Sequence, residues 1–254
     1  MQHRYWDAEV KPDQYSYVNA ALSEGYSIFT YDRLGTGASD KPDAYDIVQT
    51  TVQVEILRQL TSLARAGKLV SSSKKISGSS ASVLGRYTPS KIIHVGHSFG
   101  SVATIGLLTQ DGTASDGAII TGFVYNDQLA GANVATWGFE FARQNDPVLF
   151  GDRPSGYMVQ ATKSNIQISF LKEGSFEPAL LDYAWKIRQP NSVSEFLSIG
   201  EVLFKPAPDF KGPILVSHNH ISFHPSYENH LLMFPVPCGP TVLRRGARLR
   251  LLSR

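Results

Sequence analysis

The segment Lys91–Ser101 (KIIHVGHSFGS) restricts the possible folds more than any other part of the sequence. Its apolar run Ile92–Val95 indicates a buried strand, and Ser98–Leu108 is apolar and long enough for a helix. Between them, residues 96–100 (GHSFG) match the pattern G-x-S-x-G in the strand–turn–helix context that this pattern requires. We therefore predict a sharp turn that holds Ser98 in a strained backbone conformation, with glycines where neighbouring side chains would clash.

This predicted turn would make Ser98 a candidate nucleophile. A strand-to-helix turn lifts the Ser98 hydroxyl above the carboxyl edge of the sheet, at a helix N-terminus that favours developing negative charge. The backbone N–H of Phe99 would then be one donor of an oxyanion hole. The alternative is a buried serine in a tight turn that takes no part in catalysis.

Three further apolar runs indicate buried strands: Ser27–Tyr31, Ala118–Tyr125 and Pro213–Val216. Val48–Ala66 has apolar residues at helical spacing, and Tyr15–Leu22 is a shorter helix candidate. Alternating strands and helices imply a parallel sheet with crossover helices. The predicted fold class is therefore α/β, a mostly parallel sheet with flanking helices.

The connection from 130 to 209 is far longer than an ordinary loop. It contains helical patterns at Phe176–Gln189 and Ser192–Leu203, so we predict an inserted helical cap over one edge of the sheet. The predicted domains are thus residues 1–129 for the first part of the core, 130–209 for the cap, and 210–254 for a last core strand with an irregular basic tail. The Ser- and Gly-rich residues 71–82 indicate a flexible surface loop. Four aromatic residues of the cap are candidates for lining an apolar pocket, or for the core of the cap: Trp137, Phe139, Phe141 and Trp185.

A glycine-rich segment, YDRLGTGASDKP at 31–42, follows the first predicted strand. Gly35 and Gly37 permit a tight turn, and Asp32 and Arg33 can fix the loop by hydrogen bonds. Taken together with Ser39, these residues are similar to the pattern D-x-R-G-x-G-x-S, with Leu34 standing between Arg33 and Gly35.

With the GHSFG turn, this segment resembles the α/β-hydrolase superfamily, most closely fungal-type serine hydrolases with a helical cap, over about residues 3–216. The resemblance implies hydrolysis of a small apolar ester or similar acyl bond without a cofactor. Ser98 would attack the carbonyl, the Phe99 N–H would bind the oxyanion, and a histidine oriented by a carboxylate would act as general base.

Two departures from the family pattern leave the general base and the acid unassigned. The family has early strands and an H-G-x loop with a second oxyanion donor, whereas this chain starts at MQHRYW, so we expect an incomplete fold. After Val216 the only acid is Glu228, and Asp127 is either an alternative catalytic acid or a plain loop residue. Four histidines follow Val216, at spacings too irregular to predict a metal site: His218, His220, His224 and His230.

A second hypothesis follows from these departures, namely a catalytically inactive α/β-hydrolase-like protein or binding module. Val216-Ser217 can be encoded by GTNAGT, the form of an intron's 5′ end. A truncated or mis-spliced product would explain the loss of pattern after about residue 216.

Composition excludes several classes of protein. Hydrophobic residues make up 42% and charged residues 18%, which excludes disorder of the whole chain. The net charge is +2, but residues 241–254 hold five Arg and no acid, so the rest is mildly acidic and no nucleic-acid partner is expected. The basic end is either a solvated tail or a contact for an anionic surface.

The single cysteine, Cys238, excludes a disulfide within the chain and a Cys/His zinc pattern. No apolar run approaches the roughly 20 residues of a membrane span, and the first residues do not resemble a signal peptide. We therefore predict a cytoplasmic protein, and the sequence does not indicate its oligomeric state.

Overall fold

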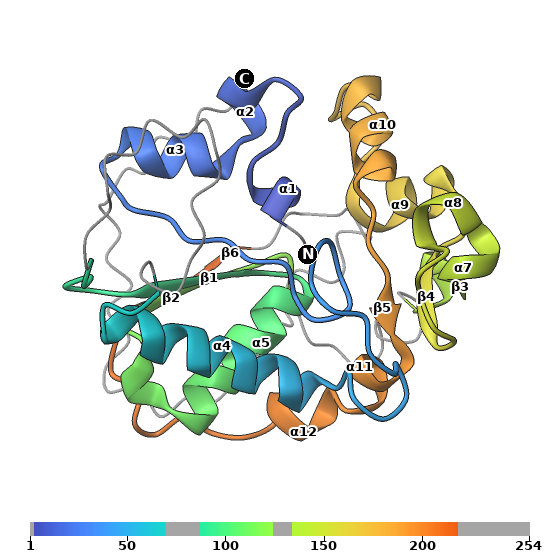
Figure 1. Ribbon diagram of the computed structural model, residues 1–254. Helices are drawn as coiled ribbons and strands as arrows, with labels where there is room; N and C mark the ends of the chain where they lie inside the picture. Colours follow the sequence, from blue (N-terminus) through green and yellow to red (C-terminus); the bar gives the residue numbers. More distant parts are fainter. Residues whose placement is uncertain (1–2, 70–86, 124–133, 218–254) are drawn as a thin grey trace, which may run out of the picture.

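The computed structural model describes residues 3–69, 87–123 and 134–217, and Figure 1 shows how their elements are arranged. The α-helices are α1 (His3–Trp6), α2 (Pro12–Tyr15), α3 (Tyr17–Ser23), α4 (Thr50–Arg65), α5 (Phe99–Gln110), α7 (Ala142–Asn145), α8 (Pro147–Phe150), α9 (Lys163–Phe170), α10 (Pro178–Lys186), α11 (Val193–Leu197) and α12 (Gly200–Leu203). The strands are β1 (Ile93–His97), β2 (Gly117–Thr121), β3 (Phe139–Phe141), β4 (Tyr157–Gln160), β5 (Asn191–Ser192) and β6 (Ile214–Ser217), and a 3-10 helix, η1 (Gly112–Ala114), precedes β2. The predicted loop at 71–82 and the basic tail lie outside the described residues.

Three parallel strands form the main sheet, in the order β1-β2-β6. β1 pairs with β2 from Ile93 opposite Gly117 to His97 opposite Thr121, and β6 pairs with the other edge of β2. The helix α5 connects β1 to β2, which is the strand–helix–strand crossover expected between parallel strands. The predicted α/β fold with a parallel sheet and flanking helices is therefore confirmed.

The sheet lies between two layers of helices, with α4, α5 and α12 on one face and α1–α3 on the other (Figure 1). α4 is amphipathic, as its periodicity predicted, whereas α5 is apolar around most of its circumference and is buried between α4 and the sheet. One core cluster joins α4, α5 and α12: Val54, Val102, Leu107, Val202 and Leu203. None of the helices in the described ranges has the length and apolar character that crossing a membrane requires.

The strand predicted at Ser27–Tyr31 is absent, since these residues pair with none of the strands described here. Their side chains are exposed or only partly buried, and Phe29 is 53% exposed. A five-residue apolar run does not by itself supply the pairing partner that makes a strand, so the prediction was wrong. The strand predicted at Ala118–Tyr125 is shorter than expected, because β2 ends at Thr121 and Gly122 follows with φ +57°.

Residues 134–217 contain more than the helices that the sequence indicated. β3, β4 and β5 form a small antiparallel sheet that we did not predict. The helical pattern at Ser192–Leu203 divides into α11 and α12, and α12 packs on α5 rather than standing apart from the core. The boundaries of a cap at 130–209 stay a prediction.

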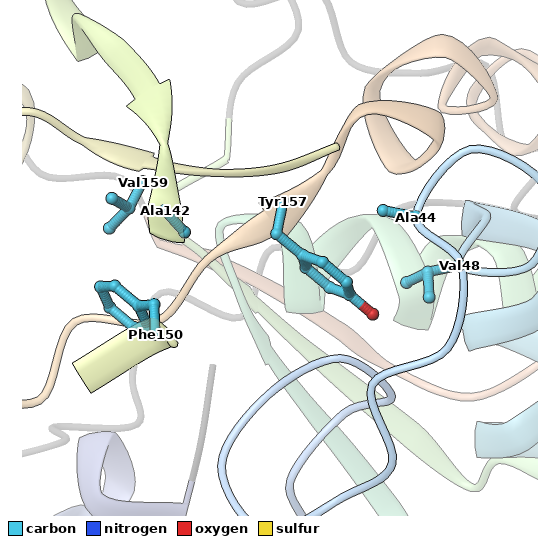
Figure 2. Packing of buried hydrophobic residues seen from close by; sticks show 6 residues of the cluster. All are labelled: Ala44, Val48, Ala142, Phe150, Tyr157 and Val159. Atoms are coloured by element: carbon cyan, nitrogen blue, oxygen red, sulfur yellow. The ribbon is translucent and has the colours of Figure 1, made fainter. Parts of the chain in front are cut away.

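A second hydrophobic core surrounds Tyr157, which is almost fully buried (Figure 2). Its members come from the loop before α4 and from α7, α8 and β4: Ala44, Val48, Ala142, Phe150, Tyr157 and Val159. The Tyr157 hydroxyl donates to the Pro42 carbonyl oxygen at 2.8 Å, and burial raises the pKa of this hydroxyl to about 12. This core therefore attaches the small sheet to the segment that follows the glycine-rich loop.

A buried polar triad ties α4 to the main sheet. His94 of β1 lies with its Nε2 2.9 Å from the Thr61 hydroxyl and its Nδ1 2.8 Å from the Ser115 hydroxyl. Burial lowers the pKa of His94 to about 4, so the imidazole is neutral at pH 7.

Stability is expected to fall between pH 6.5 and pH 4 because of His94. An unfolded chain binds a proton at this residue near pH 6.5, but the folded chain does so only near its lowered pKa. The unfolding free energy should therefore drop by about 2 kcal/mol between pH 7 and pH 5 from this group. Urea unfolding at both pH values tests this, with His94→Gln as the comparison. The variant should be less stable at pH 7 but should show a shallower pH dependence, and parallel curves for the two proteins would contradict the assignment.

Candidate active site

Ser98 occupies a sharp turn between β1, which ends at His97, and α5, which begins at Phe99. Its backbone has φ +51° and ψ −121°, a strained conformation for a residue with a side chain. Backbone hydrogen bonds hold it on both sides: the Ser98 N–H donates to the Thr121 carbonyl at 2.9 Å, and the Ser98 carbonyl accepts from the Ser101 N–H at 2.8 Å. The predicted strand-to-helix turn and its strained backbone are therefore present.

The two glycines of the pattern differ in what they allow. A Cβ at Gly96 would lie 2.5 Å from the Gly100 carbonyl oxygen and 2.6 Å from the Ser101 Cα, so only glycine fits there. A Cβ at Gly100 would meet no atom within 4 Å. The expected clash thus exists at Gly96, while at Gly100 the expectation was wrong.

The Ser98 side chain is partly exposed and does not cap α5. Phe99 is the first residue of that helix, so its N–H belongs to the first-turn donors that have no acceptor within the helix. The partial positive charge of the helix N-terminus lies at the same place. An anion forming beside the Ser98 hydroxyl would therefore find a hydrogen-bond donor and a favourable potential.

His97 precedes Ser98 and is held on two sides. Its ring stacks on Tyr5 with centroids 5.0 Å apart, and its Nδ1 lies 2.9 Å from the Thr121 hydroxyl. Burial lowers the pKa of His97 to about 4, so this ring carries no charge at pH 7. The aromatic stack places α1 against the residue next to Ser98.

The glycine-rich loop is fixed by Asp32, as the sequence indicated. Its carboxylate accepts the Ala38 N–H at 2.9 Å and the His3 N–H at 2.9 Å. Burial disfavours the charged carboxylate, but these hydrogen bonds outweigh it and lower the pKa of Asp32 below its ordinary value. Gly35 and Gly37 both have positive φ, which confirms the tight turn.

Arg33 reaches further than the loop. Its guanidinium forms a buried ion pair with Glu195 of α11 and donates to the Asn191 side-chain oxygen at 3.3 Å. The Gln53 Nε2 donates to the same Glu195 oxygen at 2.8 Å. Neither Glu195 nor Gln53 was predicted from the sequence. The spacing of Ser192 and Glu195 matches a capping box, which marks a helix start, but no local signal pairs Glu195 with an arginine 162 residues away.

The four aromatic residues proposed for a pocket do not form one cluster. Trp137 and Phe139 pack with Phe196 of α11, at centroid distances of 5.2–5.6 Å. The ring of Trp185 instead contacts Arg188, whose guanidinium carbon lies 3.6 Å from the ring centroid. Phe141 is 44% exposed and lines an open groove of about 310 Å³, together with Phe139, Glu140, Gln144 and Met158.

Asp127 and the four histidines after Val216 lie outside the described residues. Within residues 3–217 as described, His3 pairs with Asp32, His94 with Thr61 and Ser115, and His97 with Thr121. The same part of the chain holds no group of three residues that could bind a metal ion.

One solved plant enzyme has the same fold. Tomato methylketone synthase I, as a point mutant, matches with a TM-score of 0.51 and 16% identity, covering 78% of this chain and 70% of that one. The same enzyme in complex with 2-tridecanone gives the same values. A methylesterase from Arabidopsis has a TM-score of 0.47 and 14% identity, covering 79% of this chain and 82% of that one. A search of curated proteins gave no match.

A family comparison covers nearly the whole chain. The family described as "Alpha/beta hydrolase family" matches residues 2–243. This match extends past Val216, so the resemblance expected over about residues 3–216 continues beyond them. The fold, the strained serine turn and the extent of this match agree: the chain belongs to the alpha/beta hydrolase family.

Proposed function

We propose that this protein is a serine hydrolase that cleaves a small apolar ester or a similar acyl bond. The observation that carries the proposal is the position of Ser98, strained and partly exposed at the N-terminus of α5. A strained conformation persists only where surrounding contacts hold it, and such sites are often functional.

The proposed reaction begins with attack of the Ser98 Oγ on the ester carbonyl carbon. The carbonyl oxygen becomes an oxyanion, which accepts a hydrogen bond from the Phe99 N–H. A histidine takes the hydroxyl proton and passes it to the leaving alcohol, and water then releases the acid from the acyl-enzyme.

Ester hydrolysis by matched variants tests the proposal. Ser98→Ala should reduce the rate on p-nitrophenyl butyrate by about a hundredfold or more, because an acyl-enzyme cannot form without the hydroxyl. Ser175, an exposed serine in the 134–217 segment, supplies the control, and Ser175→Ala should keep the full rate. Equal rates for the wild type and Ser98→Ala would contradict the proposal and would favour a binding module with the hydrolase fold.

A further inference from the structure

The Arg33 guanidinium lies over the ring of Phe99, 4.4 Å from its centroid. This distance is within the range of a cation–π contact, which strengthens when the partners are removed from water. Phe99 follows Ser98 directly and is the first residue of α5. Arg33 therefore contacts the residue whose backbone N–H we assign to the oxyanion.

Burial and an ion pair hold the Arg33 guanidinium in this position. Arg33 is 5% exposed and Glu195, its ion-pair partner, is 1% exposed. Glu195 is itself fixed, because its Oε2 accepts the Ser192 N–H at 2.9 Å and its Oε1 accepts from Gln53. The cation over the Phe99 ring is thus held by contacts from α4, β5 and α11.

We infer that Arg33 is a positioning residue for the oxyanion site: it clamps the Phe99 ring and so fixes the direction of the Phe99 N–H beside Ser98. This inference rests on the proposed function. A hydrogen-bond donor that already points at the oxyanion stabilises the transition state more than a donor that must first reorient. Small displacements of such groups cost about ten- to a hundredfold in rate.

If Arg33 only stabilised the fold, its replacement should affect activity no more than the replacement of another buried arginine. Arg188 allows this comparison. Arg188 is also buried, lies 3.6 Å over the ring of Trp185, and donates to Asp146 at 2.9 Å. It differs in lying on the segment between α10 and β5, where its ring partner does not adjoin Ser98. Arg188→Met should cost stability as Arg33→Met does, without touching the proposed oxyanion donor.

The experiment compares Arg33→Met, Arg33→Lys and Arg188→Met at a temperature where circular dichroism shows each variant folded. Its first readout is the rate of labelling by a fluorophosphonate, together with kcat and KM for p-nitrophenyl butyrate. Arg33→Met should lower kcat and the labelling rate about ten- to a hundredfold with KM within twofold. Arg33→Lys should recover part of the loss, since ammonium keeps the cation–π contact. Arg188→Met should match the wild type. Equal labelling rates for both methionine variants would overturn the inference.

A second readout does not depend on activity. Hydrogen exchange of a peptide covering residues 96–108 should be faster in Arg33→Met than in Arg188→Met, because the first turn of α5 loses its clamp. If the wild type shows no labelling that depends on Ser98, the proposed function fails, and this exchange measurement alone decides whether Arg33 holds Phe99. Equal exchange in the two variants overturns the inference in either case.

Discussion

The Gly96→Ala variant is expected to lose about 3 kcal/mol or more of its unfolding free energy. The added Cβ would lie 2.5 Å from the Gly100 carbonyl oxygen and 2.6 Å from the Gly100 carbonyl carbon, both of which are backbone atoms. A flexible side chain could move aside, but here β1 and the first turn of α5 would have to separate. That movement would also disturb the hydrogen bonds that hold Ser98.

Gly100→Ala is the matched control within the same pattern. Its Cβ would enter open space, and alanine in a helix is favoured over glycine by up to about 1 kcal/mol. Urea unfolding at pH 7 should therefore place Gly100→Ala at or above the wild type and Gly96→Ala far below it. Similar losses in both variants would show that the turn is not packed as described.

Glu195→Ala should destabilise the fold by about 3–5 kcal/mol, because it leaves the buried Arg33 guanidinium without its counter-charge. Glu195 also accepts hydrogen bonds from Gln53 and from the Ser192 N–H, so three donors lose their acceptor together. Such a loss should lower the midpoint of thermal unfolding by about 6–20 °C for a chain of this size.

The surface pair of Glu55 and Arg58 supplies the control. Glu55 accepts two hydrogen bonds from Arg58, at 2.8 and 2.7 Å, in the same acid–arginine arrangement but in contact with solvent. Glu55→Ala should shift the midpoint far less than Glu195→Ala, since exposed ion pairs contribute little. A double variant, Arg33→Met with Glu195→Leu, should recover part of the stability lost in Glu195→Ala. Comparable losses for Glu55→Ala and Glu195→Ala would contradict the buried network.

Local signals in the sequence predicted the elements whose patterns are long or specific. The GHSFG turn was predictable because strand, glycine and helix stand in the required order, and α4 because its apolar spacing persists over four turns. The strand expected at Ser27–Tyr31 failed because a short apolar run does not show whether a partner strand lies beside it. β5 was missed because two residues carry no periodicity.

Contacts between residues far apart in the sequence could not be predicted from local patterns. Arg33 was identified only as a loop residue, while its contacts with Glu195 and the Phe99 ring depend on how three elements fold together. The split between α11 and α12 likewise follows from packing, because Val202 and Leu203 enter the core beside α5. A helical pattern gives the buried face of a helix, but not the element against which it packs.

The most direct test of the central claim is to find where a fluorophosphonate probe attaches to the full-length protein. Such a probe forms a covalent bond only with an activated serine hydroxyl. We expect digestion and mass spectrometry to locate a single adduct on Ser98, lost in Ser98→Ala and retained in Ser175→Ala. Absence of any adduct on the folded wild type, or an adduct that persists undiminished in Ser98→Ala, would contradict the assignment of Ser98 as the nucleophile.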